Sequence, residues 1–420
     1  MDHFTYQDGI LHAEHVPLPE IAASVGTPFY CYSAATLTRH YQVFAEAFRE
    51  IPTLICFAVK ANGNLAVLRT LARLGAGADT VSEGEIRKAL AAGVPPQKIV
   101  FSGVGKTRGE MRFALKSGIG QFNVESPEEL EILSEEAVAH GGKARVTIRV
   151  NPDVDAGSHD KISTGRKTDK FGVAWESVLP TYARARVLPG IRIVGVTCHI
   201  GSQLTKLEPF RAAFARIVHL VKELRAGGHT IEVLDLGGGL GIPYDSAKEI
   251  PPLPADYARM VLDQVQHLGC KLMLEPGRLI AGNAGILVAR VVLTKRTPHR
   301  TFVIVDAGMN DLMRPSLYDA WHEILPVKEA NGDASPVDVV GPVCETADVF
   351  GKQRLLPAMQ PGDLLAFRSC GAYGASMAST YNARLLVPEV MAHGDAFHII
   401  RARQSYEAML ASDSIPSWLE

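Results

Sequence analysis

Eight short apolar runs alternate with helical patterns between about residue 53 and residue 276, and this alternation determines the architecture that we expect. Continuous apolar runs of this length are typical of strands buried on both faces of a parallel sheet. The runs are TLICFAVK, GADTV, KIVFSG, GQFNV, ARVTIRV, IRIVGVTCHI, IEVLDLG and KLMLEP. Eight βα units close a TIM-type barrel, so we predict an α/β fold with a (β/α)8 barrel over residues 31–282.

An open doubly wound sheet is the competing α/β architecture, although such sheets usually contain about five or six strands. The helical stretches between the runs include SPEELEILSEEAVAHGG, and its start supports the helix prediction. Ser126 and Glu129 have the spacing of a capping box, and Pro127 would occupy the first helical position. The number of strands favours the barrel.

Beyond about residue 283 the sequence changes to β-branched runs separated by glycine, proline and aspartate. Examples are GILVARVVLTKRT, RTFVIVDAG and PGDLLAFRSCGAYG, and the pattern predicts an all-β barrel or sandwich over residues 283–420. Pro388 and the Pro361-Gly362 turn disfavour a parallel sheet there. Residues 1–30 contain isolated strands without a helical partner, so we expect them to pack on this β domain.

The composition excludes several classes of function. The chain has 420 residues and a formal net charge of -2 with both signs interspersed, so nothing indicates a nucleic-acid or membrane partner. Its six cysteines lack CxxC pairs and lie mostly in apolar runs, which argues against a disulfide framework and against a metal site. The start lacks a signal-peptide pattern and no run has bilayer-spanning length, so we expect a cytoplasmic protein.

Lys60 directly follows the first apolar run, where a barrel strand would reach its carboxyl end. Active sites of TIM-type barrels form at these ends. Partial burial would lower the pKa of this lysine and favour the neutral amine, which can attack a carbonyl carbon. The alternative is a strand-end lysine whose ammonium group reaches solvent.

The other strand ends are also polar, so several of them could contribute to one site. The candidates are Asp79 and Glu85 after the second run, Arg149 after the fifth, His199 and Ser202 after the sixth, Gly237 to Gly241 after the seventh, and Glu275 and Arg278 after the eighth. Taken singly, Asp79 could cap a helix, Arg149 could be a surface cation and His199 could be a core histidine.

The glycine run DLGGGLGIPY indicates a phosphate, because small residues let backbone N–H groups close around an anion, and barrels often bind phosphate after strands seven and eight. A dinucleotide-binding fold would place such glycines in its first βα turn, leading into a helix, whereas Pro243 stops this run. A lysine nucleophile, a phosphate loop, a histidine and a buried carboxylate together describe a pyridoxal phosphate site.

Six sequence blocks also resemble those of a known family. FAVKANGN, HIGSQ, DLGGGLGIPY, EPGR, CET and GAYGASMASTYNAR occur in this order over nearly the whole chain. In these blocks the chain closely resembles the alanine-racemase-type (fold type III) pyridoxal phosphate decarboxylases. The resemblance implies that Lys60 forms a Schiff base with pyridoxal 5'-phosphate, that His199 stacks on its ring and that Glu275 pairs with its pyridinium nitrogen. The other implied cofactor contacts are Asp79, Ser202, Gly238, Gly239, Gly277, Arg278 and Tyr373.

Within that family the match is best to the members that decarboxylate meso-2,6-diaminopimelate to L-lysine and CO2 in lysine biosynthesis. The implied substrate contacts are Arg278, Arg314, Tyr318, Glu345 and Tyr373. The resemblance also implies a homodimer in which Cys344 and Glu345 of one chain complete the site of the other. By charge and hydrogen-bonding geometry, arginines suit the substrate's carboxylate and Glu345 suits its ammonium group. Cys344 is our candidate for the acid that protonates the carbanion after CO2 leaves.

Two other functions stay open at this point. A related decarboxylase of ornithine, arginine or lysine would bring a distal cation to Arg314, which like-charge repulsion disfavours. A cofactor-binding protein without catalysis on the same scaffold would be expected to lack Lys60 or Cys344, and both are present. Arg314 and Glu345 could also form structural ion pairs rather than bind a ligand.

Overall fold

The chain forms two compact units in the computed structural model, which describes residues 2–155, 164–165, 169–245, 250–330 and 332–419. One unit comprises residues 38–280, and the other combines residues 1–37 with residues 281–420. The N-terminal segment therefore belongs to the same unit as the C-terminal third of the chain.

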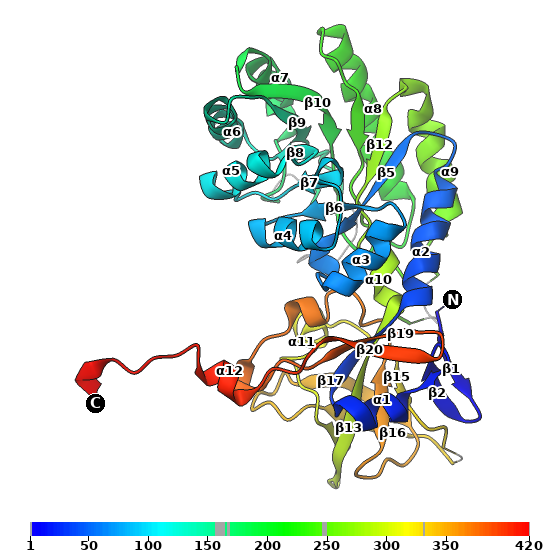
Figure 1. The fold of residues 1–420 in the computed structure, drawn as a ribbon. Helices are drawn as coiled ribbons and strands as arrows, with labels where there is room; N and C mark the ends of the chain where they lie inside the picture. Colours follow the sequence, from blue (N-terminus) through cyan, green and yellow to red (C-terminus); the bar gives the residue numbers. More distant parts are fainter. Residues whose placement is uncertain (1, 156–163, 166–168, 246–249, 331, 420) are drawn as a thin grey trace. The chain divides into compact units, whose positions relative to one another are not determined.

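The unit of residues 38–280 is a closed barrel of eight parallel strands (Figure 1). The order around the barrel is β10-β11-β12-β5-β6-β7-β8-β9, and Leu272 of β12 pairs with Thr53 of β5 to close it. The strands are β5 (Thr53–Ala58), β6 (Gly77–Thr80), β7 (Ile99–Phe101), β8 (Gln121–Val124), β9 (Ala144–Arg149), β10 (Ile191–Thr197), β11 (Val233–Asp235) and β12 (Lys271–Leu274). Each predicted run contains one strand, so the barrel is confirmed and the open sheet is excluded.

Helices follow the barrel strands and cover the outside of the barrel (Figure 1). They are α2 (Ala34–Ala47) ahead of the first strand and then α3 (Leu65–Arg73), α4 (Glu83–Ala91), α5 (Arg108–Ser117), α6 (Pro127–Ala139), α7 (Val178–Val187), α8 (Glu208–Ala226), α9 (Pro254–Val265) and α10 (Arg278–Ala281). The side chain of Ser126 accepts a hydrogen bond from the backbone of Glu129, and Pro127 begins α6, as the sequence predicts.

The barrel unit contains an apolar cluster of buried residues from several of its strands. The cluster consists of Leu54, Cys56, Val100, Val194, Val233 and Met273. The register between β9 and β10 shifts between Ile193 and Gly195, and a Cβ atom on Gly195 would lie 1.9 Å from the carbonyl oxygen of Val233 in β11. Only glycine lets β10 and β11 approach so closely.

The second unit is built on a nine-stranded mixed sheet together with a small antiparallel sheet of β1 (Phe4–Gln7), β2 (Ile10–Ala13) and β3 (Val16–Pro17). In the large sheet, β4 (Phe29–Ser33) lies between β13 (Gly285–Arg296) and β19 (Glu389–His393). The other strands are β14 (Thr301–Val305), β15 (Ile324–Pro326), β16 (Ser335–Val340), β17 (Val349–Leu356), β18 (Leu364–Phe367) and β20 (Ala396–Arg401). The prediction that the N-terminal strands join the β domain is confirmed.

The helices of the β unit are short. They are α1 (Leu18–Val25), α11 (Arg314–Tyr318) and α12 (Tyr406–Leu410). The core of this unit joins both ends of the sequence, since Phe4, Leu11 and Phe29 pack in one buried cluster with Ile286 and Val288. Within the described residues, no helix is both long and apolar enough to cross a membrane.

Candidate active site

Lys60 and Asp79 form an ion pair at the carboxyl ends of neighbouring strands. Strand β5 ends at Ala58, and a 3₁₀ turn over Val59–Ala61 carries Lys60. Asp79 pairs with Ala58 in the register of β5 and β6, so the two side chains meet, with Lys60 Nζ 2.7 Å from Asp79 Oδ2. The Asp79 side chain is fully buried and the Lys60 side chain is 40% exposed. Asp79 therefore anchors the lysine rather than capping a helix.

A buried amide connects Glu275 to a second carboxylate. Asn123 of β8 donates hydrogen bonds from Nδ2 to Oε1 of Glu275 and to Oδ2 of Asp235, each at 3.1 Å, and to Oγ of Ser102. Burial raises the pKa of Glu275 well above its usual value, and the charges of Asp235 and Asp79 raise it further. Burial likewise raises the pKa of Asp235 to about 6. A proton is thus held readily at this pair of carboxyl groups.

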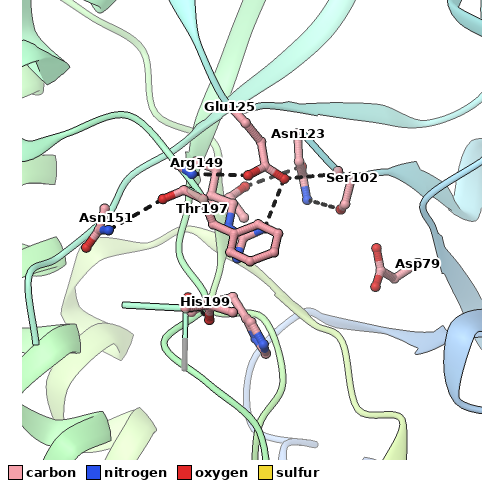
Figure 2. A network of polar contacts seen from close by, with 12 residues as sticks. Asp79, Ser102, Asn123, Glu125, Arg149, Asn151, Thr197 and His199 are labelled. Atoms are coloured by element: carbon pink, nitrogen blue, oxygen red, sulfur yellow. Dashed lines mark hydrogen bonds and ion pairs between the residues drawn. The ribbon is translucent and has the colours of Figure 1, made fainter. Parts of the chain in front are cut away.

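Arg149 ends β9 and is held below the surface by Glu125 (Figure 2). Its Nη1 donates to Oε1 of Glu125 at 2.9 Å, and the guanidinium lies 4.9 Å from the ring centroid of Phe171. Glu125 also accepts hydrogen bonds from the backbone of Gly103 and Gly172. Arg149 is only 8% exposed, so its alternative assignment as a surface cation is wrong.

His199 follows β10, and its ring is neutral. Its Nδ1 lies 3.2 Å from the backbone nitrogen of Gly238, whose N–H donates, so the ring proton is carried by Nε2. Burial lowers the pKa of His199 well below its ordinary value, and the nearby charges of Arg149 and Lys60 lower it further. The residue is half-buried and lies beyond the end of β10 at the barrel mouth (Figure 2).

The glycine run after β11 brings three strand-end loops into backbone contact. A Cβ atom on Gly238 would lie 2.3 Å from the carbonyl oxygen of Glu275, and one on Gly239 would lie 2.4 Å from that of Gly201. Gly239 also has a φ of 108°, which side-chain-bearing residues rarely adopt. The run therefore offers bare backbone at the barrel mouth.

Arg278 places a cation in the same unit. It lies at the start of α10, directly after Gly277, and is 7% exposed. Its Nη2 donates to Oγ of Ser202 at 3.0 Å, and its Nη1 donates to the hydroxyl of Tyr244 at 2.5 Å. A guanidinium with two hydroxyl groups is suited to bind an anion.

Glu85 belongs to α4 of the barrel, where its Oε2 accepts a hydrogen bond from the backbone of Val81. The other predicted residues lie in the β unit. Arg314 and Tyr318 belong to α11, Cys344 and Glu345 belong to the loop between β16 and β17, and Tyr373 follows β18 with a φ of 56°. A hydrogen bond of 2.6 Å from Ser316 to the carbonyl oxygen of Ala347 joins α11 to that loop. Arg314 is 5% exposed, whereas Cys344 is exposed and is the only one of the six cysteines that is not buried.

The barrel matches the model of a known protein family. Residues 34–282, more than half of the chain, match the model described as "Pyridoxal-dependent decarboxylase, pyridoxal binding domain". The chain belongs to the pyridoxal-dependent decarboxylase family. The resemblance seen in the sequence blocks is therefore confirmed, and so is pyridoxal phosphate as the cofactor of this fold.

Full-length relatives within this decarboxylase family cover both units. The chain is 50% identical over 417 residues to a diaminopimelate decarboxylase of Vibrio cholerae, with 99% of each chain covered. The crystal structure of the M. jannaschii diaminopimelate decarboxylase in complex with L-lysine matches with a TM-score of 0.95 at 39% identity, over 100% of this chain and 99% of that one. The crystal structure of the I148L mutant of a Helicobacter pylori diaminopimelate decarboxylase, also complexed with L-lysine, matches with a TM-score of 0.91 at 42% identity. The match covers 94% of this chain and 98% of that one.

The residues at the barrel mouth fit the cofactor of this decarboxylase family. Among the described residues, none hydrogen-bonds the buried Oδ1 of Asp79, so an acceptor is left for a polar ligand. The bare backbone of Gly238 and Gly239, together with Arg278, suits a phosphate group. A carboxyl group of high proton affinity, Glu275, suits a basic ring nitrogen.

Sequence reasoning missed the polar layer below the site. It consists of Gln121, Asn123, Thr147, Thr197 and Asp235, which hydrogen-bond one another inside the barrel. A signal was present, because Gln121 and Asn123 occupy one face of a strand in GQFNV, where an apolar core would need apolar residues. Polar side chains on the inward face of a barrel strand indicate that the core ends at that level.

Proposed function

We propose that this chain decarboxylates meso-2,6-diaminopimelate to L-lysine and CO2 with pyridoxal 5'-phosphate. The full-length match to diaminopimelate decarboxylases carries the proposal, because it spans the β unit with Arg314 and Glu345 as well as the barrel with Lys60. When bound, the cofactor supplies a ring that accepts the electron pair released as CO2 leaves.

Lys60 is the residue that would hold the cofactor covalently through Nζ. Before this nitrogen can act as a nucleophile it must lose a proton, and Oδ2 of Asp79 lies 2.7 Å away to accept it. Because the carboxylate of Asp79 is buried, it holds the lysine in one place at the end of β5. The position of the Lys60 side chain and the removal of its proton therefore both depend on its contact with Asp79.

Glu275 would keep a proton at the ring nitrogen. Asn123 holds Oε1 of Glu275 through a hydrogen bond, so the other oxygen is restricted in position. His199 would lie on the ring face as a neutral aromatic, fixed by the N–H of Gly238. Ser202, Gly238, Gly239, Gly277, Arg278 and Tyr373 are the proposed contacts for the phosphate and the rest of the cofactor.

The β unit would select the substrate. Arg314, with Arg278, is suited to bind a carboxylate, and Glu345 is suited to bind the ammonium group at the distal end of diaminopimelate. Tyr318 and Tyr373 would contribute hydroxyl groups. Cys344 is exposed in the described chain and would donate the proton that replaces CO2 at the α-carbon.

We also propose a cytoplasmic homodimer with shared sites. In this arrangement Cys344 and Glu345 of one chain complete the site around Lys60 of the other chain. The exposure of both residues in a single chain is compatible with such a role, because each is available to a partner.

A decarboxylase of ornithine, arginine or lysine is the nearer alternative. A Vibrio vulnificus lysine/ornithine decarboxylase shares the fold, with a TM-score of 0.79 at 23% identity. The purified protein, loaded with pyridoxal phosphate, should release CO2 and L-lysine from meso-diaminopimelate much faster than it releases CO2 from ornithine, arginine or lysine. Preference for a basic amino acid over diaminopimelate would refute the proposal.

A further inference from the structure

The buried Arg314 of the β unit has a neighbour whose role the reaction does not yet explain. Arg314 begins α11, and the chain reverses at Asp319, which has a φ of 51° and donates its N–H to the carbonyl oxygen of Arg314. This reversal returns the chain so that Nε2 of His322 lies 2.9 Å from Nη1 of Arg314. His322 is fully buried and Arg314 is 5% exposed.

The chemistry of arginine determines the protonation of His322. A guanidinium only donates hydrogen bonds, so Nε2 must carry a lone pair and no proton. The proton is then on Nδ1, which lies 2.7 Å from the carbonyl oxygen of Arg368 and donates to it. In a positively charged imidazolium ring Nε2 would also carry a proton, so its N–H would face the N–H groups of Nη1 with no acceptor between them. The geometry therefore requires a neutral ring in one tautomer, with each nitrogen making a different contact.

A second group close to His322 is also neutral. Sγ of Cys370 lies 3.4 Å from Nδ1 of His322, and burial raises the pKa of this thiol to about 12 while Arg314 lowers it. The contact of His322 with Arg314 thus orients the guanidinium without compensating its positive charge. A carboxylate in the place of His322 would orient the guanidinium too, but it would neutralise the charge that a ligand carboxylate needs.

We infer that His322 is a positioning residue that orients Arg314 for the distal carboxylate of the substrate. The inference rests on the proposed function and adds a residue to it. Restricting a flexible arginine before binding reduces the entropy lost when the ligand is bound. Because the reacting end of the substrate does not depend on this contact, the effect should fall on KM rather than on kcat.

Two substitutions separate the two nitrogens of His322. In His322→Gln the side-chain oxygen can reach the position of Nε2 and accept from Arg314, whereas in His322→Asn the amide can replace Nδ1 and donate to Arg368 only. We expect His322→Asn to raise KM for meso-diaminopimelate by about ten- to a hundredfold, the range for losing a hydrogen bond to a charged group. Its kcat, and its slow reaction with lysine, which lacks the distal carboxylate, should change little. His322→Gln should stay close to wild type.

Cys370→Ala is the matched control, because it removes a buried neighbour of His322 and leaves the acceptor for Arg314 in place. It should keep the wild-type KM. If His322 had only a structural role, His322→Asn would be tolerated because it keeps the hydrogen bond to Arg368, and His322→Gln would be the defective variant. Equal losses of activity on diaminopimelate and on lysine would also overturn the inference. If His322→Asn does not fold, a raised KM in His322→Gln alone overturns it. A wild-type protein inactive on diaminopimelate would instead refute the proposed function.

Discussion

The carboxyl groups at the barrel mouth differ in their environments, and the environment of Glu275 is the most suited to keep a carboxyl group protonated. Glu275→Gln should leave the cofactor bound but lower kcat by at least about a hundredfold, on the scale of other positioned proton-transfer groups. Visible absorbance of the bound cofactor and steady-state turnover measure the two effects. Glu129→Gln is the control, since Glu129 is a buried carboxyl in the same unit that binds Lys106 instead. Near-normal turnover in Glu275→Gln would point to another partner for the ring nitrogen.

The neutral ring of His199 has a consequence for stability as pH falls. In the unfolded chain this ring takes up a proton near its ordinary pKa of 6.5, whereas in the folded chain its pKa is well below that value. The unfolded state then binds more protons, so His199 removes stability progressively as pH falls below about 6.5. Between about pH 7 and pH 5, the melting temperature of His199→Phe should therefore fall less than that of the wild-type protein. Parallel melting curves in this range would contradict the assignment of a neutral ring.

At the scale of an element, the glycine run allows the loops after β10 and β11 to approach each other closely. Gly239→Ala adds a Cβ atom 2.4 Å from a backbone carbonyl at a φ of 108°, so the loops after β10 and β11 must separate. We expect a loss of about 1–3 kcal/mol in the free energy of unfolding and weaker retention of the cofactor.

Gly142→Ala is the matched control for this loop, because an added Cβ atom there meets nothing within 4 Å. Denaturant unfolding and dialysis against cofactor-free buffer measure the two effects. If both variants behaved alike, the close approach of the loops would not matter for binding.

Elements with a strong local pattern could be predicted from the sequence, and contacts between distant elements could not. Each of the eight barrel strands was predicted because a doubly buried strand needs a continuous apolar run, and α6 because Ser126 and Pro127 specify its start. The bridge from Asn123 to Glu275 joins residues 152 positions apart, and no local pattern encodes it. The contact between Arg314 and His322 depends on a left-handed residue at Asp319, which carries a weak sequence signal.

At the scale of the whole molecule, the proposed shared site can be tested by mixing two inactive chains. Lys60→Ala and Cys344→Ala chains should together recover up to about a quarter of the active sites after random exchange. Half of the dimers are then hybrids, and each hybrid has one site with both residues intact. Exchange is verified independently with differently tagged chains. Proven exchange without any recovery would place Lys60 and Cys344 in the site of a single chain.

The proposed function depends on Lys60 as the residue that carries the cofactor, and the attachment of the cofactor can be measured directly. Borohydride reduction of the purified, cofactor-loaded protein fixes the cofactor to its lysine, and peptide mapping then locates it. The predicted result is one modified peptide that contains Lys60, together with loss of both the modification and the visible absorbance in Lys60→Ala. Attachment of the cofactor to another lysine, or normal attachment in Lys60→Ala, would contradict the account.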